Sequence, residues 1–239
     1  MTLWRTILRA LVTCIMLLLV SCIDSREEFW IETNGSGRAH ISYTIPASAA
    51  RMHGGDDGIR KLIGDFFRAT PSIKQPHHAV FTENGRTTVT VEFAFDSALD
   101  LMRTGSSDSL DRLPAAASHF FGETKMNWSG RSLEITRNIS PGKALPGAAL
   151  LPSSQLVGRL VTIMHLPAAA LESNATRTEN HGRTLVWETP FADAVRSPVT
   201  YRFTMGVPLP WTMLGWIMAP LALLGGWVWI RRLGVRSIE

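Results

Sequence analysis

Cysteine is almost absent from this chain of 239 residues, which contains only Cys14 and Cys22. Cys14 lies in an apolar N-terminal segment that we expect to be removed, so Cys22 would be the only cysteine of the mature chain. A single cysteine cannot form an intramolecular disulfide, even in an oxidising compartment. The sequence therefore excludes a disulfide-stapled fold, and stability must come from a hydrophobic core.

A charge surplus is also missing from the body of the chain. The formal net charge is +4, but the surplus belongs to the two ends. These ends carry Arg5, Arg9, Arg231, Arg232, Arg236 and Glu239. Positive and negative charges balance within residues 22–210, so no basic surface for DNA or RNA is indicated. We expect no nucleic-acid partner.

Motifs for catalysis and for metal binding are lacking as well. The chain contains no G-x-S-x-G, no P-loop and no H-E-x-x-H sequence. His53, His77 and His78 come closest to a set of metal ligands, but adjacent histidines on an extended segment point to opposite faces. We interpret these histidines as part of a polar loop. We predict no catalytic residue, no metal ligand and no cofactor, and expect that the protein is not an enzyme.

Long hydrophobic runs occur only at the ends, and the first of them resembles a signal peptide. Residues 10–20 are apolar and follow two arginines, and the segment closes with Leu19-Val20-Ser21-Cys22. This is the layout of a bacterial lipoprotein signal peptide, in which the cysteine receives a lipid such as palmitate. We predict that residues 1–21 are removed and that Cys22 is lipidated. The alternative is an uncleaved N-terminal anchor.

The second hydrophobic run extends from Trp211 to Ile230 without a charged residue. Twenty apolar residues suffice to cross a bilayer as a helix, so a transmembrane helix is predicted over 211–230. The arginines that follow favour a cytoplasmic location for the basic tail, residues 231–239. The expected location is therefore the cytoplasmic (inner) membrane, with a lipid anchor, a single-pass helix and residues 22–210 outside.

Between these runs, alternating apolar side chains indicate strands separated by turns. The turns end at Gly37-Arg38, Gly85-Arg86, Gly130-Arg131 and Gly182-Arg183. The alternating runs include 41–45, 89–95, 133–135, 160–166, 185–187 and 199–205. Helical spacing appears at Ile59–Arg68, and a further short helix is expected within Asp108–Phe121. We predict an α+β domain over 22–210, with a large, mostly antiparallel sheet and a few packed helices, followed by the transmembrane helix.

Three segments near the end of this domain carry a resemblance to a known family. They are Met164-His165-Leu166-Pro167, Glu172-Ser173-Asn174, and the run from Asn180 to Trp187. In these segments the chain resembles the LppM-type envelope lipoproteins and a related cyanobacterial domain, although Ala168 stands where that pattern has glycine. The resemblance implies a non-enzymatic envelope protein that contacts lipids or glycolipids. It implies no binding residues, because Pro167, Asn174 and Trp187 are explained by strand ends, turns and core packing.

Two functions are compatible with these observations. In the first, the domain binds a membrane lipid or other amphiphile in an apolar groove, one wall of which is formed by Leu62, Ile63, Phe66 and Phe67 of the predicted helix. In the second, it is an interaction or assembly platform for a membrane protein complex. A large interior cavity would favour the first function. A solid core with an exposed apolar patch would favour the second.

Overall fold

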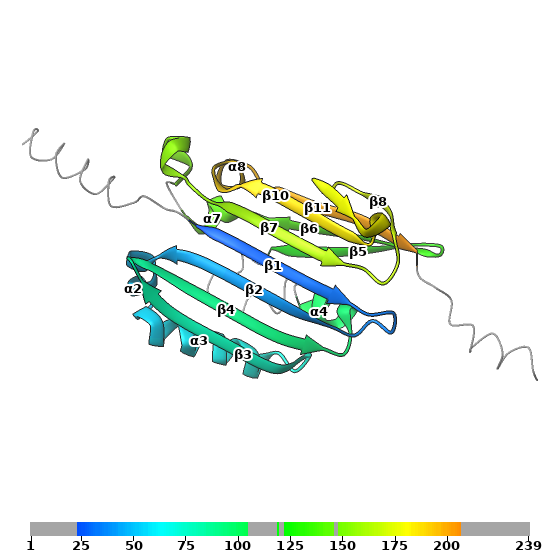
Figure 1. Cartoon of the computed structure of the whole chain (residues 1–239), viewed down its shortest axis with the longest axis horizontal. Coiled ribbons are helices and arrows are strands. Elements are labelled where there is room, and N and C mark those ends of the chain that lie inside the picture. The colour runs from blue at the N-terminus through cyan, green and yellow to red at the C-terminus, as the bar shows by residue number, and fades with distance from the viewer. Residues whose placement is uncertain (1–22, 105–118, 120–121, 146–147, 207–239) are drawn as a thin grey trace, which may run out of the picture. The chain divides into compact units, whose positions relative to one another are not determined.

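Strands dominate the computed structural model, which describes residues 23–104, 119, 122–145 and 148–206. By its contacts the chain divides into two units, 1–206 and 207–239, and all described residues belong to the first. The described strands form one sheet of seven strands and one of four, named here sheet A and sheet B (Figure 1).

Sheet A has the strand order β3-β4-β2-β1-β7-β10-β9. Its strands are β1 (Asp24–Ile31), β2 (Gly37–Pro46), β3 (Ile73–Glu83), β4 (Arg86–Phe95), β7 (Arg159–His165), β9 (Arg177–Glu179) and β10 (Thr184–Pro190). Neighbouring strands are antiparallel except for the central pair, β1 and β7, which are parallel. A parallel pair requires a long crossover connection, and here it is made by everything between β1 and β7.

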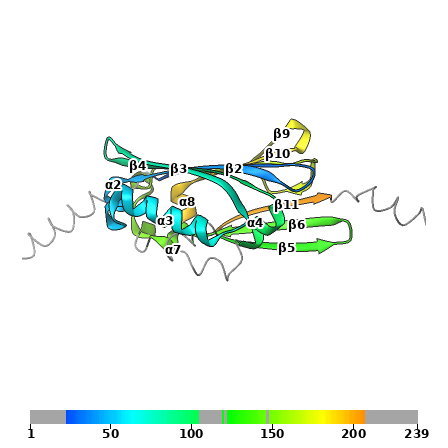
Figure 2. The ribbon, with the colours of Figure 1, turned by 90° about the horizontal axis from the view of Figure 1, so that it is seen from below.

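Sheet B has the order β5-β6-β11-β8 and is antiparallel throughout. Its strands are β5 (Glu123–Ser129), β6 (Ser132–Ile139), β8 (Ala170–Ser173) and β11 (Val199–Gly206). A register shift interrupts the pairing of β11 with the short edge strand β8. In Figure 2, sheet B lies on one side of sheet A, which we call the inner side.

The helices lie on the same inner side of sheet A (Figure 2). They are α2 (Ala47–Met52), α3 (Gly55–Ala69), α4 (Ala98–Thr104), α7 (Pro141–Ala144) and α8 (Phe191–Arg196). Short 3-10 turns are η1 (Ala148–Leu150), η2 (Ser153–Gln155) and η3 (Asn180–Gly182), of which η3 joins β9 to β10. The longest of them, α3, packs against β3. It begins after Gly54, which has a positive φ of 86°, and Asp56 and Asp57 lie in its first turn, where the helix dipole favours negative charge.

The predicted strand runs and turns are confirmed. Residues 41–45, 89–95, 133–135, 160–166, 185–187 and 199–205 lie in or alongside β2, β4, β6, β7, β10 and β11. Asn84 and Gly85 both have positive φ in the tight turn between β3 and β4, as the glycine-containing sequence predicts. The expected helix at Ile59–Arg68 is α3. The helix expected within Asp108–Phe121 falls almost entirely outside the described residues.

The predicted fold class, however, is wrong in its architecture. The described residues form a mostly β structure of two facing sheets, not an α+β domain built on one large sheet. Alternation of apolar side chains shows that a strand has one buried face, but it does not show which strands pair, so both sheets give the same pattern.

The prediction of a C-terminal transmembrane helix also needs correction. No helix in the part of the chain that the structure describes combines the length and apolar composition needed to cross a bilayer. Residues 211–230, where this helix was expected, lie outside the described residues. An uncharged run of sufficient length meets the hydropathy criterion without establishing a helix, and the single-pass inner-membrane topology is therefore not supported.

Candidate functional site

The four helix residues predicted to form a groove wall lie on α3, and three of them pack into the core. Ile63 packs with Ala50, Ile59 and Val80 beneath the edge of sheet A. Phe66 and Phe67 are adjacent, with ring centroids 6.0 Å apart, and both pack on the cluster that contains Phe93. Leu62 is the most exposed of the four, at 38%. Ligand contact at these residues stays a prediction, and their main structural role is to cover β3 and β4.

A charged pair is buried where the two sheets face each other. Glu27 of β1 in sheet A accepts two hydrogen bonds from the guanidinium of Arg137 of β6 in sheet B, one of them over 3.1 Å. Tyr43 also donates to the Glu27 carboxylate, and Thr162 lies 3.4 Å from it. The side chains of Glu27 and Arg137 are only 6% and 15% exposed. This bidentate arrangement satisfies the charges of both groups and fixes the position of one sheet over the other.

The electrostatics of this cluster keep Glu27 ionised. Burial disfavours its charged form, but the positive charge and hydrogen bonds of Arg137 outweigh burial, and the pKa of Glu27 lies below its ordinary value. The pKa of Tyr43 is raised well above its ordinary value by burial and by the negative charge of Glu27. Tyr43 therefore remains a neutral hydrogen-bond donor. The cluster holds a carboxylate and a guanidinium in their charged states, which suits a structural clamp.

Asn174 makes a second polar link between the sheets. It follows β8 of sheet B, and its side-chain oxygen accepts hydrogen bonds from the Arg202 amide at 2.7 Å and from the Trp187 indole at 2.9 Å. Its side-chain nitrogen donates to the Thr200 carbonyl at 2.8 Å. Trp187 lies in β10 of sheet A, is 3% exposed, and packs on Phe203 of sheet B. The prediction that Trp187 fills the core is confirmed.

Trp128 lies on the face of sheet B that contributes to the core, but the described residues leave its side chain half exposed. Trp128 of β5 is paired in register with Leu133 of β6, so the two residues share a face of the sheet. Leu133 is 3% exposed and belongs to the core, whereas Trp128 is 54% exposed. Met126, two residues earlier on the same face, is half-buried. We call Met126 and Trp128 the β5 ledge.

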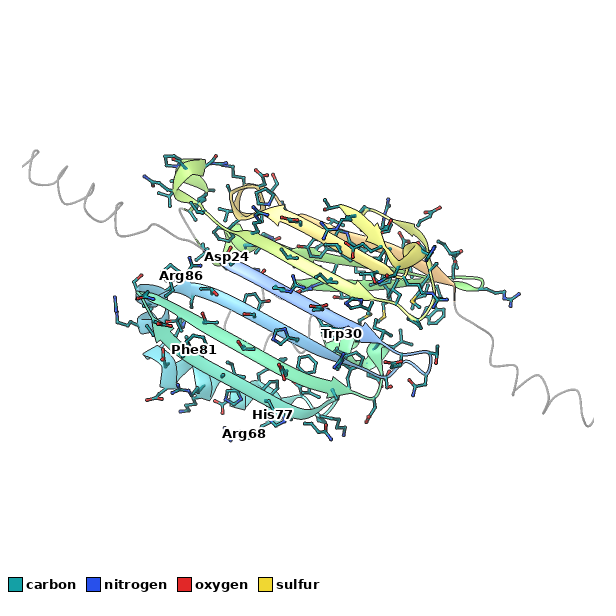
Figure 3. All side chains as sticks on the ribbon, viewed as in Figure 1. Asp24, Trp30, Arg68, His77, Phe81 and Arg86 are labelled. Atoms are coloured by element: carbon teal, nitrogen blue, oxygen red, sulfur yellow. The ribbon has the colours of Figure 1, made fainter. Side chains whose placement is uncertain are left out.

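The outer side of sheet A carries a stacked aromatic and basic cluster. Trp30 stacks on His165 with ring centroids 5.2 Å apart, and the guanidinium of Arg38 lies 4.4 Å from the Trp30 ring centre. Figure 3 labels Trp30 on β1. Glu28 lies 2.9 Å from a ring nitrogen of His165. Partial burial opposes ionisation of Glu28, but its hydrogen bonds with His165 and Arg26 prevail and hold its pKa below the ordinary value.

The histidines that sequence analysis placed in a polar loop lie elsewhere. His77 and His78 are within β3, so that part of the interpretation is wrong, although the expectation that their side chains point to opposite faces is confirmed. His77 is paired with Glu92, while the ring of His78 contacts Phe67 beneath the sheet. His53 follows α2. Among the described residues, no three His, Cys, Asp or Glu side chains are arranged to hold a metal ion.

Cys22, the predicted lipidation site, lies just outside the described residues. The next residue, Ile23, is 4% exposed, and its amide donates to the Val157 carbonyl at 3.1 Å. The residue that follows Cys22 in the chain is thus already packed in the domain.

Comparison with solved structures gives two matches. The folded domain of Mycobacterium tuberculosis LppM, determined by NMR, is similar with a TM-score of 0.49 and 11% sequence identity, over 79% of this chain and 91% of that chain. The mu homology domain of Danio rerio Fcho1, solved with a bound Eps15 peptide, has a TM-score of 0.23 and 8% identity, over 79% of this chain and 80% of that chain. No protein-family model matches the chain, and no curated protein does. The resemblance to LppM-type proteins is thus a remote structural similarity.

The buried Glu27–Arg137 pair was not found from the sequence. Glu27 and Glu28 are adjacent, and only one of them can point toward the core. The sequence signal for Glu27 is the period-2 alternation from Ile23 to Ile31, which places Glu27 on the same face as these apolar side chains. Arg137 gives a similar signal, because it stands two residues from both Ile135 and Ile139. Trp128 gave no such signal, since a tryptophan in an alternating run is usually buried.

Proposed function

We propose that this protein is an envelope lipoprotein, anchored through Cys22, whose domain binds an amphiphile without covalent chemistry. Cleavage after residue 21 and lipidation of Cys22 place the domain in the envelope. The sequence contains no recognised catalytic motif, so a binding role accounts best for the domain. The ligand class is an amphiphile with an acyl chain and a polar headgroup.

The exposure of Trp128 carries the proposal. A tryptophan on the face that forms the core of sheet B, yet 54% exposed, offers an apolar surface that the described residues leave open. Met126 extends this surface along the edge strand. An acyl chain lying on the β5 ledge would bury the exposed parts of both side chains, and removal of apolar surface from water favours binding. The ledge, and not the largely core-packed helix α3, is the more accessible apolar surface.

Quenching of tryptophan emission tests this proposal. The full chain, held in an amphipathic polymer so that no free detergent competes, would be titrated with lysophosphatidylglycerol carrying a brominated acyl chain. Bromine quenches only nearby indoles, so parent protein should lose more emission than Trp128→Phe. Trp128→Asp should weaken binding about tenfold or more, because the ring's contact with the ligand is lost.

Trp30→Phe is the matched control, because Trp30 lies on the outer side of sheet A and should not take part. Its quenching should equal that of the parent after correction for one missing indole. If parent and Trp128→Phe are quenched to the same extent, the β5 ledge is not the binding surface. Folding of each variant would be checked by circular dichroism.

A second function, an interaction platform, is favoured by the outer side of sheet A. No α-helix among the described residues covers that side in Figure 2. Phe81 of β3 is 50% exposed, and Figure 3 labels it on the edge strand of this sheet. A sheet face that no described α-helix covers and that carries an exposed aromatic residue suits a protein partner. Co-purification of a stoichiometric protein that Phe81→Asp releases would support this function over lipid binding.

A further inference from the structure

The end of the domain at which the chain enters has an apolar surface of its own. Strands β1, β4 and β7 begin at this end and β2 and β10 finish here, as the pairing registers require. Asp24 and Arg86, which lie 2.8 Å apart, mark it in Figure 3. Helix α2 leaves from β2 at the same end, with the Ala47 amide bonded to the Gly85 carbonyl at 2.9 Å. We call this the entry end.

Three large apolar side chains at the entry end are exposed. Met52, the last residue of α2, and Leu150, the last of η1, are each 85% exposed, and Val157 before β7 is 51% exposed. These are three of the seven exposed large apolar side chains among the described residues. They flank the point at which Ile23 enters, on α2 to one side and on the η1–η2 segment to the other. Met52 and Leu150, at 85% each, are the two most exposed of the seven, so the chain entry carries exposed apolar surface.

These side chains are held by ordered backbone, which argues against simple disorder of a loop. Arg196 of α8 donates to the Leu151 carbonyl at 3.1 Å and to the Ser153 hydroxyl at 2.7 Å, and so fixes the segment that carries Leu150. The Val157 carbonyl accepts the hydrogen bond from Ile23. Met52 ends a helix whose Ala47 and Ala50 are buried. The exposed apolar side chains thus project from a rigid framework.

The geometry points to direct docking of the entry end on the bilayer, with Met52, Leu150 and Val157 inserted among the lipid headgroups and upper acyl chains. This inference rests on the lipid attachment at Cys22 that the proposed function includes. One peptide unit, about 3.8 Å, separates the α-carbons of Cys22 and Ile23, so a lipid on Cys22 leaves no tether that would hold the domain away from the membrane. An acyl-anchored domain with an exposed apolar surface at its anchor would bury that surface in the same lipid.

Charges at this end are compatible with a lipid surface. Arg51 is exposed beside Met52, and a side chain of this length reaches headgroup phosphates from such a position. Two other basic residues at this end are paired with carboxylates, Arg159 with Glu188 and Arg86 with Asp24. The apolar side chains, and not a basic patch, therefore supply the main contact, and binding at this surface should persist at high salt.

Site-directed fluorescence tests the docking. Met52→Cys and Leu150→Cys would be made in the full chain, with Leu171→Cys as the control, and each protein labelled with an environment-sensitive dye. Leu171 is 65% exposed, but it lies in β8 at the opposite end of the domain (Figure 1). The lipidated proteins would be placed in phosphatidylglycerol–phosphatidylethanolamine vesicles that contain spin-labelled lipids. Dyes at 52 and 150 should be quenched severalfold more than the dye at 171.

Equal quenching at all three positions, or quenching at 171 alone, would contradict end-on docking. Mass spectrometry of the same preparation would show the lipid on Cys22, and a mature chain without it would also overturn the inference, because the short connection is its premise. Amphiphile binding at the β5 ledge is measured through Trp128, at the other end of the domain. If the protein fails to bind the amphiphile but the dyes at positions 52 and 150 are still quenched, the proposed binding at the β5 ledge is refuted and docking of the entry end is supported.

Discussion

At the scale of single residues, substitution of one member of the Glu27–Arg137 pair should destabilise the fold strongly. A buried ion pair does not stabilise a fold strongly compared with apolar residues, because desolvation offsets the attraction. Removal of one partner is different, since it leaves the other charge buried and without compensation. Glu27 also accepts hydrogen bonds from Tyr43 and Thr162, and its loss would remove these bonds as well.

Glu27→Gln should accordingly lower the free energy of unfolding by about 3 kcal/mol or more, because Arg137 keeps its charge. Chemical denaturation of the full chain followed by circular dichroism would measure the change. Glu172→Gln, at an exposed position in β8, is the control and should change stability by less than about 0.5 kcal/mol. The double variant Glu27→Leu with Arg137→Leu should recover much of the loss. A stable Glu27→Gln protein would show that the pair is dispensable.

The pH dependence of stability follows from the same pair. The pKa of Glu27 is lower in the folded chain than in the unfolded chain, where it has the ordinary value of 4.5. The unfolded state therefore binds the proton more readily, and the stability that Glu27 provides is complete above about pH 4.5 and is lost as the pH falls through the lower folded pKa. Denaturation curves at falling pH should show a smaller acid-induced loss in Glu27→Gln than in the parent. If the free energy of unfolding falls equally with pH in both proteins, Glu27 is not the source of the acid-induced loss.

At the scale of elements, helix α3 separates core residues from surface residues. Phe67 contacts Phe93 and His78 of sheet A, with centroid distances of 6.4 Å and 6.0 Å, whereas Leu62 is 38% exposed. Phe67→Asp should destabilise the domain by about 3 kcal/mol or more, as loss of a packed ring does. Leu62→Asp should cost much less. Thermal unfolding of the two variants compares their stabilities directly. A larger loss of stability in Leu62→Asp than in Phe67→Asp would show that Leu62, and not Phe67, lies on the face of α3 that packs on sheet A.

Local sequence signals predicted most of these elements. Glycine-containing turns and period-2 alternation located the hairpins, and helical spacing located α3, because these features depend on neighbours in the chain. The partition into two sheets and the parallel pairing of β1 with β7 could not be predicted, because each depends on contacts between distant segments. For the same reason Leu62, Ile63, Phe66 and Phe67 were correctly placed on one helix, while the β5 ledge and the Glu27–Arg137 pair were missed.

At the scale of the whole molecule, the proposed lipid attachment can be tested at Cys22. Lipidation of Cys22 should be detected as incorporation of an alkyne analogue of palmitate during growth, followed by dye coupling and gel analysis. The parent chain should be labelled, and Cys22→Ala should not be, because the cysteine thiol is the acceptor. Cys14→Ala serves as the control and should be labelled like the parent. Label on Cys22→Ala, or a mature chain that begins elsewhere, would refute the lipoprotein interpretation.

The parallel pairing of β1 with β7 has a consequence for the order in which the chain is made. β1 is the first strand to be synthesised, yet its register partner for Glu27 is Thr162, which lies 135 residues later. At a synthesis rate of about 5–20 residues per second, β1 waits roughly ten seconds for that partner. Sheet A cannot close during this interval, and pairing of segments so distant in sequence is itself slow. Strands β1 to β4 pair with one another and lie in the first part of the chain, so the half-sheet β3-β4-β2-β1 would form first and wait with β1 as an open edge until β7 is made.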